Sequence, residues 1–182
     1  RIASEHPEWL DRILLVEADA RRLPLAAGCA ETVLAIESLC YLDDDYELGV
    51  RQCYALLAPK GRLLLSERDR EGGLLLRLLY QGIEGMLEVS RTGIIVDGPP
   101  DAPMRTRAFT ELELTTLLND TGLDIRSIHG ISLFSVVLGW MQNKHLLDPR
   151  NMAHLPAIAT LLGELGQEGR ARRCHVIVAQ RP

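Results

Sequence analysis

Apolar positions in the first two thirds of the chain alternate between short continuous runs and a helical stripe. The runs at residues 13–16, 32–36 and 62–67 are too short for independent helices, so they predict strands buried in a sheet. Between the last two runs, apolar residues over 46–57 recur at helical spacing, and the acids at 43–45 cap that predicted helix. Strands separated by helices predict a parallel sheet with right-handed crossovers.

The last part of the chain predicts further helices and two more strands. An apolar stripe over 74–86 predicts a helix, and a second helix is expected between its N-cap Thr110 and Gly122. Residues 124–128 alternate like a strand at a sheet edge, and residues 174–179 form a last apolar run.

Three other stretches complete the pattern. Ser4 and Glu5 are typical of a helix start ahead of the first strand. Residues 98–100 form a Gly-Pro-Pro loop, and residues 131–169 are mostly helical in pattern.

Length and composition predict one soluble domain over residues 1–182, since no repeat, low-complexity tract or linker divides the sequence. The net charge of -5 and the pI near 5.6 argue against nucleic acid or an anionic membrane as the main partner. The four cysteines are scattered without a C-x-x-C pair, which favours reduced thiols. With no secretory signal and no run of 18 apolar residues, we expect a cytoplasmic protein.

Several segments carry a resemblance to one family. Residues 18–25 read Ala-Asp-Ala-Arg-Arg-Leu-Pro-Leu, residues 30–33 read Ala-Glu-Thr-Val, and residues 57–63 read Leu-Ala-Pro-Lys-Gly-Arg-Leu. They are followed by Phe-Thr at 109–110 and Thr-Gly-Leu at 121–123. In this order the segments resemble the class I S-adenosylmethionine-dependent methyltransferases, particularly the small-molecule group.

The resemblance implies a Rossmann-like α/β fold, with a mainly parallel sheet, helices on both faces and an antiparallel last strand. It also implies that the family's first strand, glycine-rich loop and second strand are missing here. We therefore expect the later, N-terminally truncated part of such a domain. These 182 residues alone are expected to hold the cofactor weakly and to be inactive.

By the same resemblance, S-adenosyl-L-methionine is the expected cofactor. The Asp19 carboxylate would accept a hydrogen bond from the adenine amino group, and the Ala20 N–H would meet a ring nitrogen. Ile36, Glu37 and Ser38 would line the methionine side of the cofactor. Glu37 is also a candidate catalytic residue, because a carboxylate there could favour the sulfonium or accept a substrate proton.

Methyl transfer from an activated sulfonium needs mainly alignment and exclusion of water, so a missing catalytic triad does not argue against it. Among the histidines, His145 and His154 lie in a segment that often covers the substrate in this family, where either could deprotonate a hydroxyl, and His145 is the second candidate catalytic residue. His6, His129 and His175 carry no pairing signal, and no ligand spacing fits a metal site.

Residues 68–108 and 131–170 are the expected substrate-side insertions. The apolar stripe within 74–86 allows three interpretations: it packs in the core, closes over an apolar acceptor, or forms the face of a homodimer. The expected partner is a small organic molecule.

Two other functions stay open at this point. One is a degenerate methyltransferase-like interaction module without catalysis. The other is a nicotinamide-dependent reductase, which the ending of the chain and the Asp19-Ala20 turn make the weaker alternative.

Overall fold

The computed structural model describes residues 11–99, 101–131, 133–145, 153–167 and 174–182. The helix start expected at Ser4 lies outside these residues. The main sheet contains four strands, in the spatial order β1-β2-β6-β5. They are β1 (Ala30–Ile36), β2 (Leu57–Arg68), β5 (Asp124–Ile131) and β6 (Cys174–Gln180).

Strand directions agree with the predicted fold class. Strands β1 and β2 are parallel, and β6 lies antiparallel to both β2 and β5. Three strands therefore run the same way and the last strand of the chain opposes them, so the mainly parallel sheet with an antiparallel last strand is confirmed.

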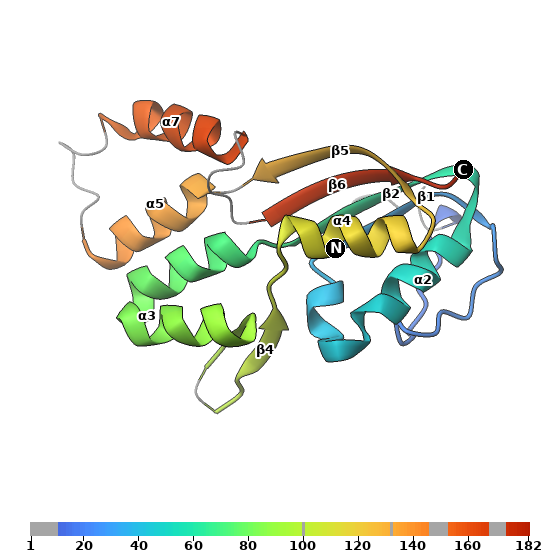
Figure 1. Ribbon diagram of the computed structural model, residues 1–182, viewed down its shortest axis with the longest axis horizontal. Helices are drawn as coiled ribbons and strands as arrows, with labels where there is room; N and C mark the ends of the chain where they lie inside the picture. Colours follow the sequence, from blue (N-terminus) through green and yellow to red (C-terminus); the bar gives the residue numbers. More distant parts are fainter. Residues whose placement is uncertain (1–10, 100, 132, 146–152, 168–173) are drawn as a thin grey trace.

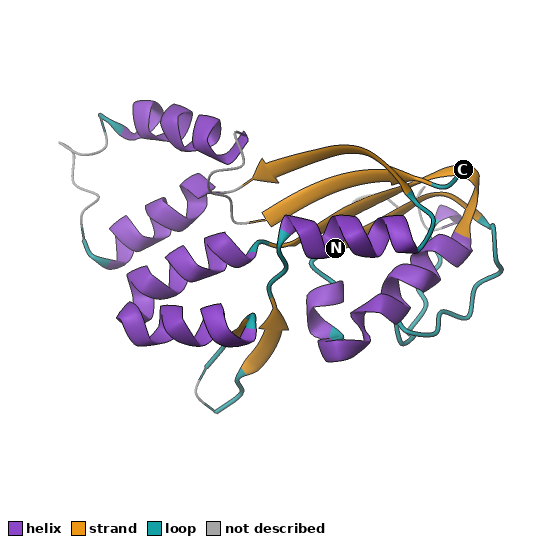
Figure 2. Ribbon diagram, in the orientation of Figure 1, coloured by secondary structure: helices purple, strands orange, loops and turns teal. Residues whose placement is uncertain are grey.

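Two helices cover one face of this sheet (Figures 1 and 2). They are α2 (Tyr46–Leu56), which connects β1 to β2, and α4 (Glu111–Asp120), which precedes β5. Their apolar sides meet the sheet in one core, formed by Val50, Cys53, Leu63, Leu65, Phe109, Leu114, Leu118, Ile177 and Ala179. Burial of these side chains is the main stabilising term for this layer.

The remaining elements lie mostly beyond the end of the sheet where β2 finishes (Figure 1). Helix α3 (Arg70–Thr92) follows β2 and is kinked at Gly82. A two-stranded hairpin of β3 (Ile94–Asp97) and β4 (Met104–Arg107) comes next. Helices α5 (Leu133–Asn143) and α7 (Leu155–Gln167) occupy the segment before β6.

The prediction of a buried strand at residues 13–16 is wrong. This segment belongs to no strand, and Leu14 and Leu15 are 80% and 90% exposed. A strand needs a neighbour for its backbone hydrogen bonds, and in the described residues β1 pairs only with β2. Leu34 and Ile36 of β1 are also exposed, so no described helix covers the second face at this edge.

Candidate functional site at the carboxyl ends of β1 and β2

The backbone changes direction sharply where β1 ends. Glu37 has a φ of 44°, in the left-handed region that a non-glycine residue rarely adopts. Its N–H donates to the Ser66 carbonyl of β2 at 2.7 Å, which fixes the start of the turn. The chain then forms two short 3-10 helices, η2 (Leu39–Tyr41) and η3 (Asp43–Asp45), before α2 begins.

Glu67, near the end of β2, accepts hydrogen bonds from the backbone of this turn. Its carboxylate is fully buried and accepts hydrogen bonds from the N–H groups of Ser38 and Leu39 at 3.1 and 2.8 Å. A third bond comes from the Cys40 N–H at 3.2 Å. Burial raises the pKa of Glu67 to about 7, since removing the charge from water outweighs the three donors.

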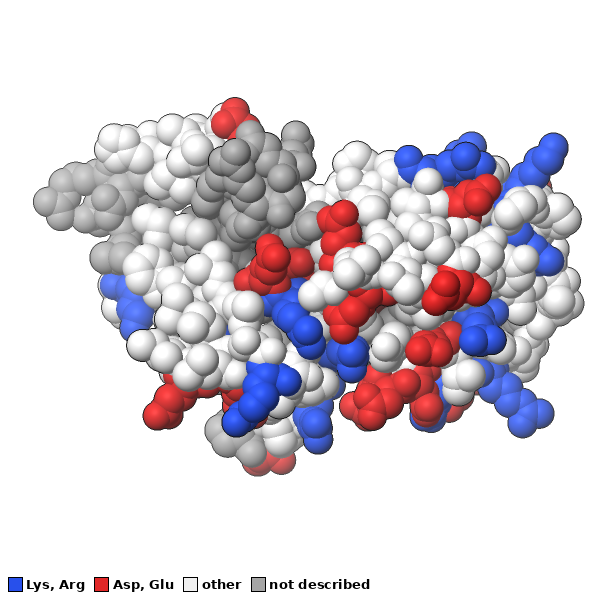
Figure 3. Space-filling model, in the orientation of Figure 1, with Lys and Arg blue, Asp and Glu red and all other residues white. Residues whose placement is uncertain are grey.

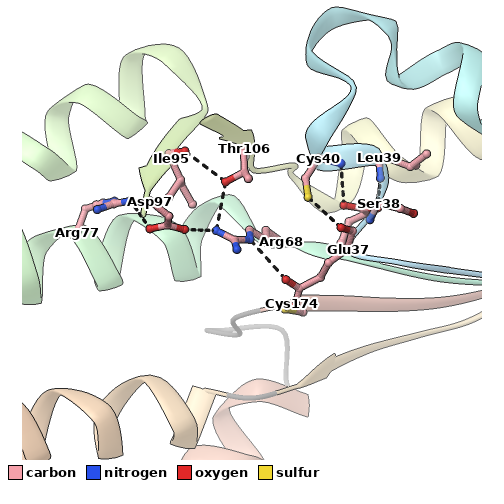
Figure 4. A network of polar contacts seen from close by, with 11 residues as sticks. Glu37, Ser38, Leu39, Cys40, Arg68, Arg77, Ile95, Asp97, Thr106 and Cys174 are labelled. Atoms are coloured by element: carbon pink, nitrogen blue, oxygen red, sulfur yellow. Dashed lines mark hydrogen bonds and ion pairs between the residues drawn. The ribbon is translucent and has the colours of Figure 1, made fainter. Parts of the chain in front are cut away.

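A chain of polar contacts runs from Glu37 along the ends of the strands (Figure 4). The Glu37 carboxylate lies 3.5 Å from Arg68 Nε and accepts from Cys174 Sγ at 3.4 Å. Arg68 in turn contacts Asp97 and donates to Thr106 at 3.1 Å. The Asp97 carboxylate also pairs with Arg77 of α3 at 2.7 Å, so opposite charges are matched along the network.

A cavity of about 250 Å³ opens beside this network, at the start of α3. Its lining includes Arg68 and Asp97 from the network, the Gly72-Gly73 backbone, and the apolar side chains of Leu76 and Ile95. A small space with both charged and apolar walls suits a small organic molecule.

The Asp19 turn lies at the same edge of the sheet. Arg21 pairs with Asp19 at 2.7 Å and with Asp45 at 3.0 Å, which ties the turn to the N-terminal end of α2. The hydrogen bond from Arg21 lowers the pKa of Asp19 to about 2, so this half-exposed side chain is an acceptor at neutral pH.

His145 is not brought together with these residues. It lies exposed after α5, with a φ of 55°, and α5 runs away from the sheet (Figure 1). The structure thus gathers Glu37 and Ser38 beside Glu67, places Asp19 at the same edge, and leaves His145 apart.

Sequence reasoning missed a buried contact between a histidine and a carboxylate next to the site. His175 Nε2 lies 2.8 Å from Asp69 Oδ1, and both side chains are almost completely buried. Asp69 also accepts from the Gly72 N–H at 2.7 Å and so begins α3. The sequence carried no pairing signal for His175, because β6 brings it next to residues more than 100 positions earlier, which no local spacing shows.

Glu67, Arg68 and Asp97 were also missed as members of the site. The run Ser66-Glu67-Arg68-Asp69 directly after three leucines was the available signal, because strand ends in open α/β sheets carry binding groups. Two absences hold within the described ranges: no group of three His, Cys, Asp or Glu residues is arranged to hold a metal, and no helix is long and apolar enough to cross a membrane.

Comparison with known proteins concerns the fold of the chain. Residues 2–65 match a family model described as a methyltransferase domain. A SAM-dependent methyltransferase from Methanosarcina mazei is similar with a TM-score of 0.57 and 16% identity, over 90% of this chain and 65% of that one. The chain has the class I methyltransferase fold. The resemblance drawn from the sequence is confirmed.

Two further solved structures share the fold at 16% identity. One is the Burkholderia thailandensis 1,6-didemethyltoxoflavin-N1-methyltransferase with bound 1,6-didemethyltoxoflavin and S-adenosylhomocysteine, with a TM-score of 0.57 over 98% of this chain and 55% of that one. The other is the [4+2]-cyclase SpnF, with a TM-score of 0.56 over 99% and 59%. The chain thus spans less than two thirds of these three structures. No curated protein matches it.

Proposed function

We propose that this chain forms the adenine-side and acceptor-side part of an S-adenosylmethionine-dependent methyltransferase that acts on a small organic molecule. The observation that carries the proposal is the convergence of the Asp19 turn, the strained Glu37 turn and the 250 Å³ cavity at one sheet edge. Ligands of open α/β sheets bind at this edge. The family match over residues 2–65 contains Asp19 and Glu37.

The residues present fit such a cofactor. Asp19 offers carboxylate lone pairs to an amino group while it remains paired with Arg21. Glu37 lies at the same edge, where its partly exposed carboxylate could face a sulfonium or an amino cation. When bound, the cofactor supplies an activated methyl group.

The chain's own residues would position the acceptor. A small molecule in the cavity would lie against Leu76 and Ile95, with Arg68 and Asp97 able to orient its polar groups. Glu37, one third exposed and next to Arg68 of the cavity lining, is a carboxylate that could take up a proton released by the acceptor. Methyl transfer itself requires alignment more than side-chain chemistry.

A second candidate function is binding or catalysis without methyl transfer. The observation that favours it is the shared fold of a [4+2]-cyclase, since one fold hosts many chemistries. A protein of this second kind could still bind S-adenosylhomocysteine, whereas a cofactor-free interaction module would not. A binding measurement with this compound therefore separates the two.

Asp19→Ala tests the adenine side of the site. We expect S-adenosylhomocysteine to bind the variant about tenfold more weakly in calorimetry, because one charge-assisted hydrogen bond is lost. Asp124→Ala is the matched control. Asp124 likewise lies 3.6 Å from an arginine two residues later, Arg126, but it is at the start of β5, on the side of the sheet away from β1. If the two variants bound S-adenosylhomocysteine with equal affinity, Asp19 would not be part of the cofactor site.

A further inference from the structure

The buried carboxylate of Glu67 has no contact with solvent and no role in the chemistry proposed above. It lies under the turn that leaves β1 and accepts three consecutive backbone N–H groups, at 2.8 to 3.2 Å. A buried charge is costly unless hydrogen bonds compensate it, so its retention at this position needs an explanation.

Among the described residues, no other acceptor meets these three N–H groups. Helix η2 begins at Leu39, and the side chain of its N-cap, Ser38, makes no capping bond. Consecutive N–H groups that converge in this way form an anion-binding concavity, and the Glu67 carboxylate from the neighbouring strand supplies the anion.

The same contact stabilises an unfavourable backbone conformation. Glu37, with a φ of 44°, lies between the last residue of β1 and the first N–H that Glu67 accepts. A left-handed non-glycine residue persists only where its surroundings hold it. Here the Ser66 carbonyl holds the Glu37 N–H, and Glu67 holds the residues that follow.

We infer that Glu67 is a positioning residue of the cofactor site, which holds the backbone of residues 37–40 in the conformation that binds the cofactor. The inference rests on the proposed function, since it concerns the same edge of the sheet. Glu67 acts through the turn and does not contact the cofactor itself.

Protonation gives this role a measurable signature. A carboxylic acid has one O–H in place of an acceptor, so a protonated Glu67 cannot hold all three N–H groups equally well. Burial raises the pKa of Glu67 to about 7, which places the change near neutral pH. The titratable and charged groups around it are Cys40 and Cys53, Glu37, Arg68, and His175 opposite it in the β2–β6 register.

The experiment compares the wild-type chain, Glu67→Gln and Glu113→Gln between pH 6 and pH 8. Glu113 is the matched control, because its carboxylate also accepts a backbone N–H, from Thr110 at 2.7 Å, but at the start of α4. NMR follows the amides of Ser38, Leu39 and Cys40, and calorimetry measures the affinity for S-adenosylhomocysteine.

We expect the three wild-type amides to shift with a midpoint near pH 7 and the wild-type affinity to be several-fold higher at pH 8 than at pH 6. In Glu67→Gln the amide titration should vanish and the affinity should fall about tenfold at pH 8, with little pH dependence. Glu113→Gln should behave as wild type at this site.

Failures of the two proposals are distinguishable. If the wild-type chain binds S-adenosylhomocysteine and Glu67→Gln binds it equally well, the positioning role is overturned while the proposed function stands. If the wild-type chain binds none at either pH, the proposed function fails and the inference fails with it. Should Glu67→Gln not fold, the wild-type titration decides alone: amides that do not move between pH 6 and pH 8 overturn the inference.

Discussion

Two glutamates of this chain show how burial decides the behaviour of one residue type. Burial acts to raise the pKa of Glu113, but the bonds from Thr110 in the capping box of α4 outweigh it, so the pKa is lowered. Glu67 accepts three backbone N–H groups, against one from Thr110 for Glu113, yet burial prevails and the pKa of Glu67 rises to about 7. The degree of burial therefore decides whether the pKa of a hydrogen-bonded carboxylate falls or rises.

The raised pKa of Glu67 predicts how stability changes with pH. Between its usual value of 4.5 and about 7, the folded chain binds this proton and the unfolded chain does not. The contribution is therefore complete below pH 4.5 and lost as the pH rises through about 7. We expect the free energy of unfolding to fall by up to about 3 kcal/mol over this interval.

Urea unfolding at a series of pH values measures this change. Glu67→Gln removes the titrating group, so its unfolding free energy should vary less over the same interval, whatever its absolute stability. A wild-type stability that rises from pH 5 to pH 7, with a slope unchanged in the variant, would contradict the assignment.

Single residues were predictable from the sequence where a strand end could be recognised. Glu37 and Ser38 follow an apolar run, and the structure places them where β1 ends. Asp19 was singled out by family resemblance, and its link to Asp45 depends on Arg21, which no pattern marked. The pair of His175 with Asp69 required knowledge of strand pairing and could not be predicted.

Elements with complete local signals were predicted well. Thr110 and Glu113 form both bonds of a capping box, and Gly122, with a φ of 90°, follows the end of α4. The β3–β4 hairpin was missed, because its strands are only four residues long and the intervening loop was the sole local signal. The strand expected at residues 13–16 failed because strand formation depends on a neighbour, which an apolar run does not supply.

The kink in α3 offers a test at this scale. Gly82 has a φ of 74° and a ψ of -162°, a conformation open essentially to glycine alone. An added Cβ would meet nothing within 4 Å, so any cost is one of backbone conformation. We expect Gly82→Ala to lower the free energy of unfolding in urea by about 1–3 kcal/mol.

Ser90→Ala, at an exposed position of the same helix, is the control and should leave stability nearly unchanged. If Gly82→Ala were as stable as this control, the glycine would not be needed for the kink, and a straight helix in solution would be the simpler description.

For the whole molecule, the fold class was predictable and the extent of the sheet was not. Alternating helices and strands indicated the parallel part, and the last strand is antiparallel as expected. Leu34 and Ile36 remain exposed at the β1 edge, however, and no sequence pattern distinguished this face from the buried one. Charge does not mark the site either, since acidic and basic side chains are interspersed on the face shown in Figure 3.

The central claim is that the cofactor binds along the carboxyl ends of β1 and β2, and an NMR titration of the ¹⁵N-labelled chain with S-adenosylhomocysteine tests it most directly. Because this method detects weak binding, it suits a chain that spans less than two thirds of similar structures. We predict that the largest amide shifts occur at Asp19, Ala20, Glu37 and Ser38, with none at Glu113. Shifts confined to other surfaces, or none at millimolar ligand, would contradict the account.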